Sequence, residues 1–189
     1  LLPYVEAGVL VVGIEPSCTG VLRKDAVELL ADDTARRVAA STFTLAEVLA
    51  RVGWEPPRLD GLRVLAQPHC HHHAVMGWEA DRALLEGAGA QVEALAGCCG
   101  LAGNFGVEAG HYEVSVAVAE QHLLPALRRG GHDVVLTDGF SCRLQADDLG
   151  GAQGRHLAEL LAEHLSEAPR IEGRGAPDDR PHPIDEEER

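Results

Sequence analysis

Five cysteines make up the whole thiol content of the 189-residue chain, and each follows a short apolar run. The runs GVLVVGI, LRVLA, QVEALA and DVVLT precede Cys18, Cys70, the pair Cys98 and Cys99, and Cys142. Thiolates are the ligands that iron–sulfur clusters and many zinc sites use in proteins. If the runs are parallel strands of one sheet, the loops that follow them meet at its carboxyl edge. The spacing therefore predicts a metal-cluster site to which all five cysteines contribute.

The sharpest local motif is Cys98–Cys99–Gly100, which opens the segment GLAGNFG at 100–106. Two neighbouring thiolates can reach one cluster, and glycine lets the backbone turn and bring its amides close to sulfide. The segment has GxxGxxG spacing, but it lacks the GxGxxG and the later acidic residue of a dinucleotide-binding loop. We therefore expect Gly100 and Gly103 to line the cluster with backbone amides.

Histidines flank Cys70 in the tract QPHCHHH. They could ligate a metal directly, as histidines do in Rieske-type clusters. The alternative, which we favour, is that His69 and His71 act on the cluster from outside its ligand shell, where imidazoles raise its reduction potential and move protons. The other histidines are expected at the surface, at helix ends or in packing roles: His111, His122, His132 and His156.

Apolar runs alternate with stretches of helical spacing along the chain. Strands are predicted at 9–14, 62–66, 92–95 and 134–137, and helices at 25–30, 44–52, 74–86, 112–129 and 154–165. Thr44 with Glu47 three residues later is typical of a helix capping box. This alternation predicts an α/β fold, a parallel sheet with flanking helices and with the cysteines on loops at the carboxyl ends of the strands.

Composition limits the classes of function. The formal net charge of −14 argues against a nucleic-acid or anionic-membrane surface, which needs clustered lysine and arginine. The longest apolar stretch is too short to span a bilayer, and the N-terminus lacks the layout of a secretory signal. Without such a signal, an odd number of cysteines disfavours a disulfide framework, so we expect a cytoplasmic protein, at most peripheral at the inner face of the plasma membrane.

Two segments are expected from the composition. Residues 1–168 form the cysteine-rich domain, and 169–189, rich in proline and acidic residues, form a disordered acidic tail. The only methionine is Met76, so Leu1 is not an initiator and the chain is expected to be part of a longer oxidoreductase.

In order along the chain, EPSC, PHCHHHA, GCCGLAGNFG, DGFSCRLQ and HLAELL resemble the cysteine-rich CCG domain of heterodisulfide reductase B subunits and glycolate oxidase iron–sulfur subunits. They are most similar to the C-terminal part of FAD-binding iron–sulfur oxidases of the D-lactate or glycolate dehydrogenase type, over about 9–165. The resemblance implies a [4Fe–4S] cluster, either cubane or the five-cysteine non-cubane form. The family pattern ends in CxxC, but Gly139 stands at its first position here, so Cys18 is the candidate for the missing sulfur.

The resemblance implies an electron-transfer domain of an FAD-dependent 2-hydroxyacid dehydrogenase. FAD would lie on the missing portion or a partner subunit, beside a ferredoxin-like iron–sulfur domain, and the acceptor would be a quinone, a cytochrome or another protein. Two alternatives stay open: a thiol/disulfide redox centre at Cys98 and Cys99 of the heterodisulfide reductase kind, and a zinc-stabilised interaction domain. Simple burial of cysteines as small apolar residues is the plainest reading of all.

Overall fold

The computed structural model describes residues 1–165. The acidic tail expected at 169–189, and the domain boundary at 168, lie outside the described residues. Within 1–165, no helix has both the length and the apolar character needed to cross a bilayer.

The described strands form two parallel sheets. The larger has the order β4-β3-β5-β6, with β3 (Arg63–Ala66), β4 (Gln91–Ala94), β5 (Val134–Leu136) and β6 (Gly154–Arg155). The smaller pairs β1 (Val11–Gly13) with β2 (Thr42–Thr44). The predicted α/β class with parallel strands is confirmed. The expectation of a single sheet is wrong, because the strand before Cys18 pairs with β2 instead of joining β3 to β6.

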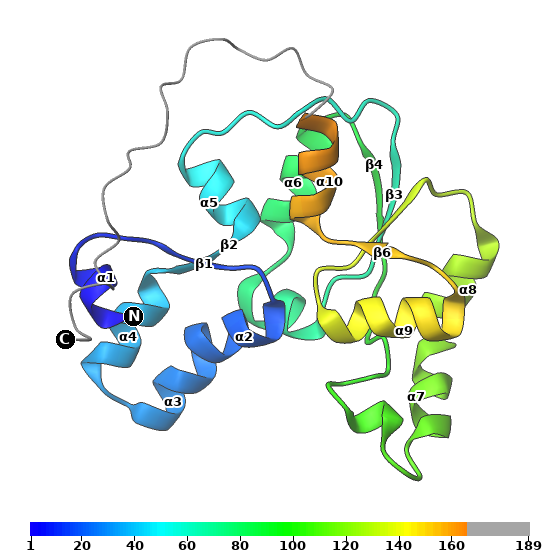
Figure 1. Ribbon diagram of the computed structural model, residues 1–189, viewed down its shortest axis with the longest axis horizontal. Helices are drawn as coiled ribbons and strands as arrows, with labels where there is room; N and C mark the ends of the chain where they lie inside the picture. The colour runs from blue at the N-terminus through cyan, green and yellow to red at the C-terminus, as the bar shows by residue number, and fades with distance from the viewer. Residues whose placement is uncertain (166–189) are drawn as a thin grey trace, which may run out of the picture.

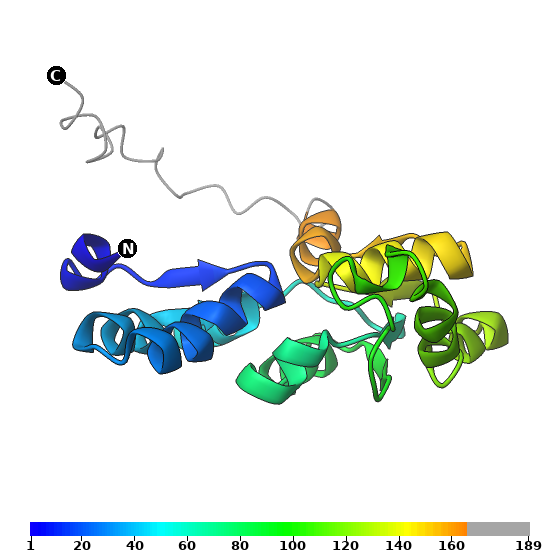
Figure 2. The same cartoon turned by 90° about the horizontal axis from the view of Figure 1, so that it is seen from below.

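Helical segments surround both sheets. They are α1 (Leu2–Glu6), α2 (Pro16–Gly20), η1 (Val21–Asp25), α3 (Ala26–Leu30), α4 (Asp33–Ala40), α5 (Leu45–Arg51), η2 (His72–Met76), α6 (Glu79–Gly87), η3 (Phe105–Val107), α7 (Tyr112–Ala119), α8 (Leu123–Arg129), α9 (Phe140–Gly150) and α10 (Leu157–Leu165). Figure 1 shows α1 to α5 with the small sheet on one side, and β3 to β6 with α6 to α10 on the other. The turned view in Figure 2 shows the same division.

Two apolar clusters hold the larger sheet and its helices together. The first packs α5, α6 and α10 against β3 and β5, and Leu85 and Leu160 are fully buried in it. The second is smaller and contains Cys99, Cys142 and Leu123, from the loop after β4, from α9 and from α8. Two of the predicted metal ligands are therefore part of the core.

The structure corrects several predicted helices. The helix expected at 74–86 is interrupted at Gly77, whose φ of +79° no helix can continue through, and it becomes η2 and α6. The helix expected at 112–129 divides into α7 and α8 at His122, where φ is −140°. Helix α9 was not predicted, because it buries polar residues such as Ser141 and Gln145 along with apolar ones. The capping box at the start of α5 is confirmed by hydrogen bonds between Thr44 and Glu47.

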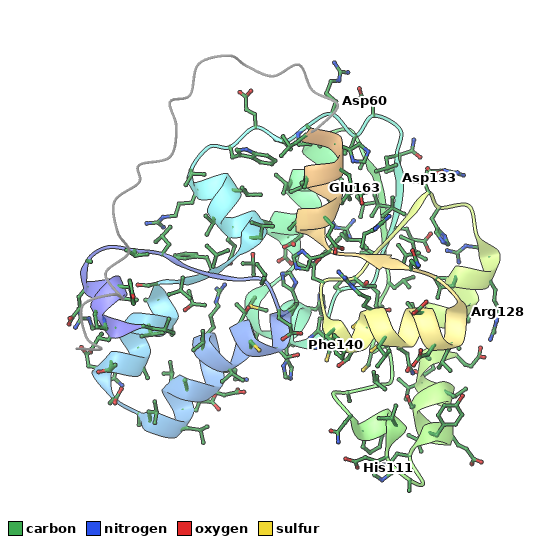
Figure 3. All side chains as sticks on the ribbon, in the orientation of Figure 1. Asp60, His111, Arg128, Asp133, Phe140 and Glu163 are labelled. Atoms are coloured by element: carbon green, nitrogen blue, oxygen red, sulfur yellow. The ribbon has the colours of Figure 1, made fainter. Side chains whose placement is uncertain are left out.

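An ion pair joins the starts of β3 and β5. The Asp133 carboxylate accepts hydrogen bonds from the backbone N–H of Arg63 at 2.9 Å and from its guanidinium at 2.6 and 3.0 Å. The hydrogen bonds from the Arg63 side chain, followed by the backbone bond, lower the pKa of Asp133 to about 2. Figure 3 shows Asp133 at one end of β5 and Phe140, which begins α9, at the other.

Replacing Asp133 by asparagine is expected to lower stability near neutral pH and to matter little near pH 2. A carboxyl group whose folded pKa is depressed contributes stability above its unfolded pKa of about 4, and that contribution is lost as pH falls toward about 2. Chemical unfolding of both chains across this range measures the difference. Asp148→Asn is the control, since Asp148 is exposed in α9 and makes no ion pair within the described residues. A wild-type-to-variant difference that does not change with pH would refute this explanation.

Candidate metal centre

Four of the five cysteines are in contact with one another. Side-chain hydrogen bonds join Cys70 to Cys98, Cys98 to Cys99, and Cys99 to Cys142. Cys70 follows β3, the pair follows β4, and Cys142 lies in the first turn of α9 after β5. Three neighbouring strands of the larger sheet thus bring together thiols that are up to 72 residues apart in the sequence.

The four thiols have a buried side and an open side. Cys99 is 3% exposed and Cys142 is 2% exposed, both within the small apolar cluster. Cys70 is exposed and Cys98 is half-buried. A cavity of about 440 Å³ adjoins Cys70 and Cys98, and its walls include Trp78 and Leu95. A group held by these thiols would therefore be shielded from solvent on one side and reachable through the cavity on the other.

The hydrogen bonds concentrate negative charge on one sulfur. Bonds from Cys70 and then from Cys99 lower the pKa of Cys98 to about 2. The bond that Cys70 makes to Cys98 raises the pKa of Cys70, and the bond to Cys142 is the main cause that raises the pKa of Cys99. Several adjacent thiolates need compensating cations, which iron ions supply when they displace the thiol protons. The four thiols fit the all-cysteine ligand shell of a [4Fe–4S] cluster, and they also fit a tetrahedral zinc ion.

The loop after β4 is shaped by glycine. Gly100 has a φ of +98°, and its N–H donates to the sulfur of Cys98 at 3.3 Å. A Cβ at this position would collide with the backbone carbonyl of Ser115. Gly103 also has a positive φ of +71°, but its N–H donates to the hydroxyl of Ser141 at 3.2 Å. Of the two amides expected at the cluster, that of Gly100 lies at a sulfur and that of Gly103 ties the loop to α9.

His69 occupies the space beside Gly139. A Cβ on Gly139 would collide with the His69 ring, so the ring fills the place next to the position where the CxxC pattern has its first cysteine. Nδ1 of His69 accepts from the backbone N–H of His71 at 3.2 Å, which assigns the proton to Nε2, 3.3 Å from the hydroxyl of Ser17. Burial lowers the pKa of His69 and favours this neutral form. Both predicted outer histidines thus flank Cys70, and their effect on a cluster stays a prediction.

Cys18 lies apart from the hydrogen-bonded group. It is exposed on α2, and its thiol bonds to the carboxylate of Glu15, which raises the pKa of Cys18. Helix α2 nonetheless packs against the histidine tract, because Gly20 faces the His71 side chain. The structure therefore brings four of the five predicted ligands into contact and places the fifth on the adjoining helix. Whether Cys18 is a ligand stays a prediction.

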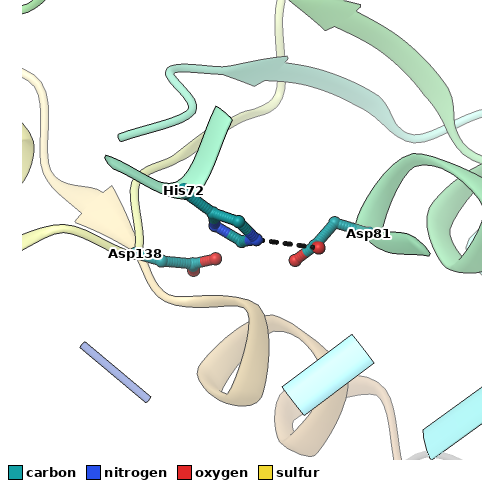
Figure 4. A group of neighbouring side chains, drawn as sticks. All are labelled: His72, Asp81 and Asp138. Carbon is teal, nitrogen blue, oxygen red and sulfur yellow. Dashed lines mark ion pairs between the residues drawn. The ribbon is translucent and has the colours of Figure 1, made fainter. Parts of the chain in front are cut away.

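A second group of polar side chains was not predicted from the sequence. His72, Asp81 and Asp138 come together in the interior, from η2, from α6 and from the end of β5 (Figure 4). Asp138 directly follows a strand at the carboxyl edge of the sheet, the position that drew attention to the cysteines, and this was the signal that could have found it. Asp81 lies within a helix and gave no comparable signal.

Comparison with known proteins links the chain to dehydrogenases. It is 29% identical over 164 residues to D-2-hydroxyglutarate dehydrogenase of Pseudomonas putida, covering 84% of this chain and 16% of that protein. The enzyme of the same name from Escherichia coli is 37% identical over 76 residues, 40% of this chain and 8% of the relative. The C-type subunit of the anaerobic glycerol-3-phosphate dehydrogenase of Escherichia coli is 28% identical over 165 residues, 84% of this chain and 41% of that relative.

These relatives are dehydrogenases or a dehydrogenase subunit. The chain spans less than half the length of each of them. No family model matches the chain.

Proposed function

We propose that this chain is the iron–sulfur, CCG-type domain of a dehydrogenase and relays electrons between a flavin and an acceptor. The observation that carries the proposal is the contact of Cys70, Cys98, Cys99 and Cys142 at the ends of three parallel strands. The dehydrogenase names of the relatives support the reaction class. They favour a 2-hydroxyacid or a glycerol-3-phosphate-type substrate for the whole protein.

The four cysteines would hold a [4Fe–4S] cluster, which supplies one-electron transfer when bound. The protein's own part is to set its environment. The N–H of Gly100 at the sulfur of Cys98 stabilises negative charge there, and His69 and His71 lie beside Cys70. Apolar packing keeps water away from Cys99 and Cys142.

FAD and the substrate site belong, in this proposal, to another part of the protein or to a partner subunit. The dehydrogenase subunit among the relatives makes a multi-subunit arrangement the natural precedent. A quinone, a cytochrome or another protein would take the electrons. The cavity beside Cys70 and Cys98 gives such an acceptor the shortest route to the thiols.

A zinc-stabilised domain is the second candidate, because four thiolates also satisfy tetrahedral zinc. Redox titration separates the two. The chain is purified and kept anaerobically, then titrated with dithionite while its visible absorbance and its EPR spectrum are recorded. An electron-transfer domain is expected to bleach reversibly and to show a paramagnetic signal in one of its two redox states. Zinc does not change its redox state, so a chain that takes up no electrons would overturn the proposal.

A further inference from the structure

The buried group of His72, Asp81 and Asp138 has the geometry of a metal site. Nε2 of His72 lies 3.2 Å from Oδ2 of Asp81, and one donor atom from each of the three residues lies within 4.8 Å of the others (Figure 4). Two ligands of a tetrahedral zinc ion with bonds of about 2.0–2.1 Å lie roughly 3.3 Å apart. The His72–Asp81 spacing already matches that separation.

Two of the donor atoms lack hydrogen-bond partners. Nε2 of His72 and Oδ2 of Asp81 are fully buried, and despite their short separation neither has a hydrogen bond to any of the described residues. The side chains of His72 and Asp81 are 4% and 2% exposed. Unpaired buried polar atoms cost about 1–3 kcal/mol each, so such a pair is retained where something else satisfies it.

The charge of the group also calls for a cation. Asp81 and Asp138 place two carboxylates in the interior, and burial raises the pKa of Asp138. His156, the other nearby imidazole, is committed elsewhere: Nε2 donates to the carbonyl of Ile14 at 2.7 Å and Nδ1 accepts from the N–H of Ala158 at 2.9 Å. This leaves His72 as the one imidazole directed at the two carboxylates within the described residues. A divalent cation would neutralise both of them.

Space is available for one ion. A cavity of about 10 Å³ is bordered by all three side chains, together with Met76 and Leu45. That is close to the smallest volume that holds a single water molecule, so a bare ion fits where a hydrated one does not. One imidazole nitrogen and two carboxylate oxygens are ligands that zinc accepts readily.

We propose that His72, Asp81 and Asp138 form a structural zinc site, separate from the cysteine centre. The ion would fix η2, α6 and the end of β5 to one another. Because His72 lies two residues after Cys70, the ion would also anchor the segment that presents Cys70 to the other thiols. The site is independent of what the cysteines hold.

The test uses the full chain with all five cysteines replaced by serine, so that thiolates cannot bind the added metal. The metal-free chain is dialysed against Zn²⁺, and bound zinc is measured. About one zinc per chain is expected, and Asp81→Asn or Asp138→Asn should weaken binding at least about tenfold. Asp60→Asn is the matched control, since Asp60 is exposed and paired with Arg58. Absence of zinc from the folded chain, or equal binding by all three variants, would overturn the site.

A second measurement covers the case in which the serine variant does not fold. Mn²⁺ prefers oxygen and nitrogen ligands to thiolates, so the wild-type chain can be titrated with Mn²⁺ and followed by EPR of the free ion. Saturable uptake that Asp138→Asn abolishes supports the site. Uptake that is absent, or that survives the substitution, contradicts it.

Discussion

Replacing Cys99 by serine is expected to abolish cluster binding. Cys99 bonds to both Cys98 and Cys142 and is 3% exposed, so no nearby residue can move in to replace its sulfur. Loss of a residue that only supports a metal ligand typically lowers metal affinity 10–100-fold, and loss of a ligand itself should cost at least as much. Iron bound per chain after anaerobic purification should therefore fall at least about tenfold, as measured by elemental analysis.

Cys18→Ser is the matched control for this prediction. Cys18 bonds to Glu15 and lies outside the four-thiol group, so the variant is expected to keep most of its iron. Retention of iron by Cys99→Ser would contradict the assignment of the four ligands. Equal loss in Cys18→Ser would instead support the five-cysteine, non-cubane cluster and contradict the four-cysteine set.

Replacing Gly100 by alanine is expected to destabilise the chain by roughly 2–5 kcal/mol. A left-handed conformation costs a residue with a Cβ roughly 1–2 kcal/mol, and overpacking adds about 1–3 kcal/mol. The added Cβ would press on the backbone carbonyl of Ser115, which lies in α7 and has little freedom to move. The free energy of unfolding from denaturant titration measures the loss, and the shift of the loop should also reduce iron content.

Gly103→Ala separates conformational strain from steric collision. Gly103 has a φ of +71°, but no atom lies within 4 Å of the position that its Cβ would take. This variant should therefore lose only roughly 1–2 kcal/mol. Equal destabilisation by the two substitutions would show that the contact of Gly100 with α7 has no special weight.

Much of the fold could be predicted from local pattern. The apolar runs before the cysteines became β1, β3, β4 and β5, and the capping box at Thr44 marked the start of α5 correctly. The pattern could not show which strands share a sheet. That outcome depends on β1 pairing with β2, a strand of three residues with no alternation long enough to detect.

The site was predicted in kind, and the grouping of its residues required the structure. Position after a strand identified all five cysteines, but only the pairing of β3, β4 and β5 separates Cys18 from the other four. The contact of His69 with Gly139 was equally hidden, because the two residues are 70 positions apart in the sequence. The group of His72, Asp81 and Asp138 depends on three elements meeting in the core, which no local spacing records.

The four clustered cysteines are proposed to hold iron and sulfide, and everything else about the function depends on this. The most direct measurement is the content of iron and acid-labile sulfide in the full chain, expressed and purified without oxygen. We predict a coloured protein with iron and sulfide in equal amounts, about four of each per chain. A colourless chain without iron or sulfide, whatever zinc it carries, would contradict the proposal.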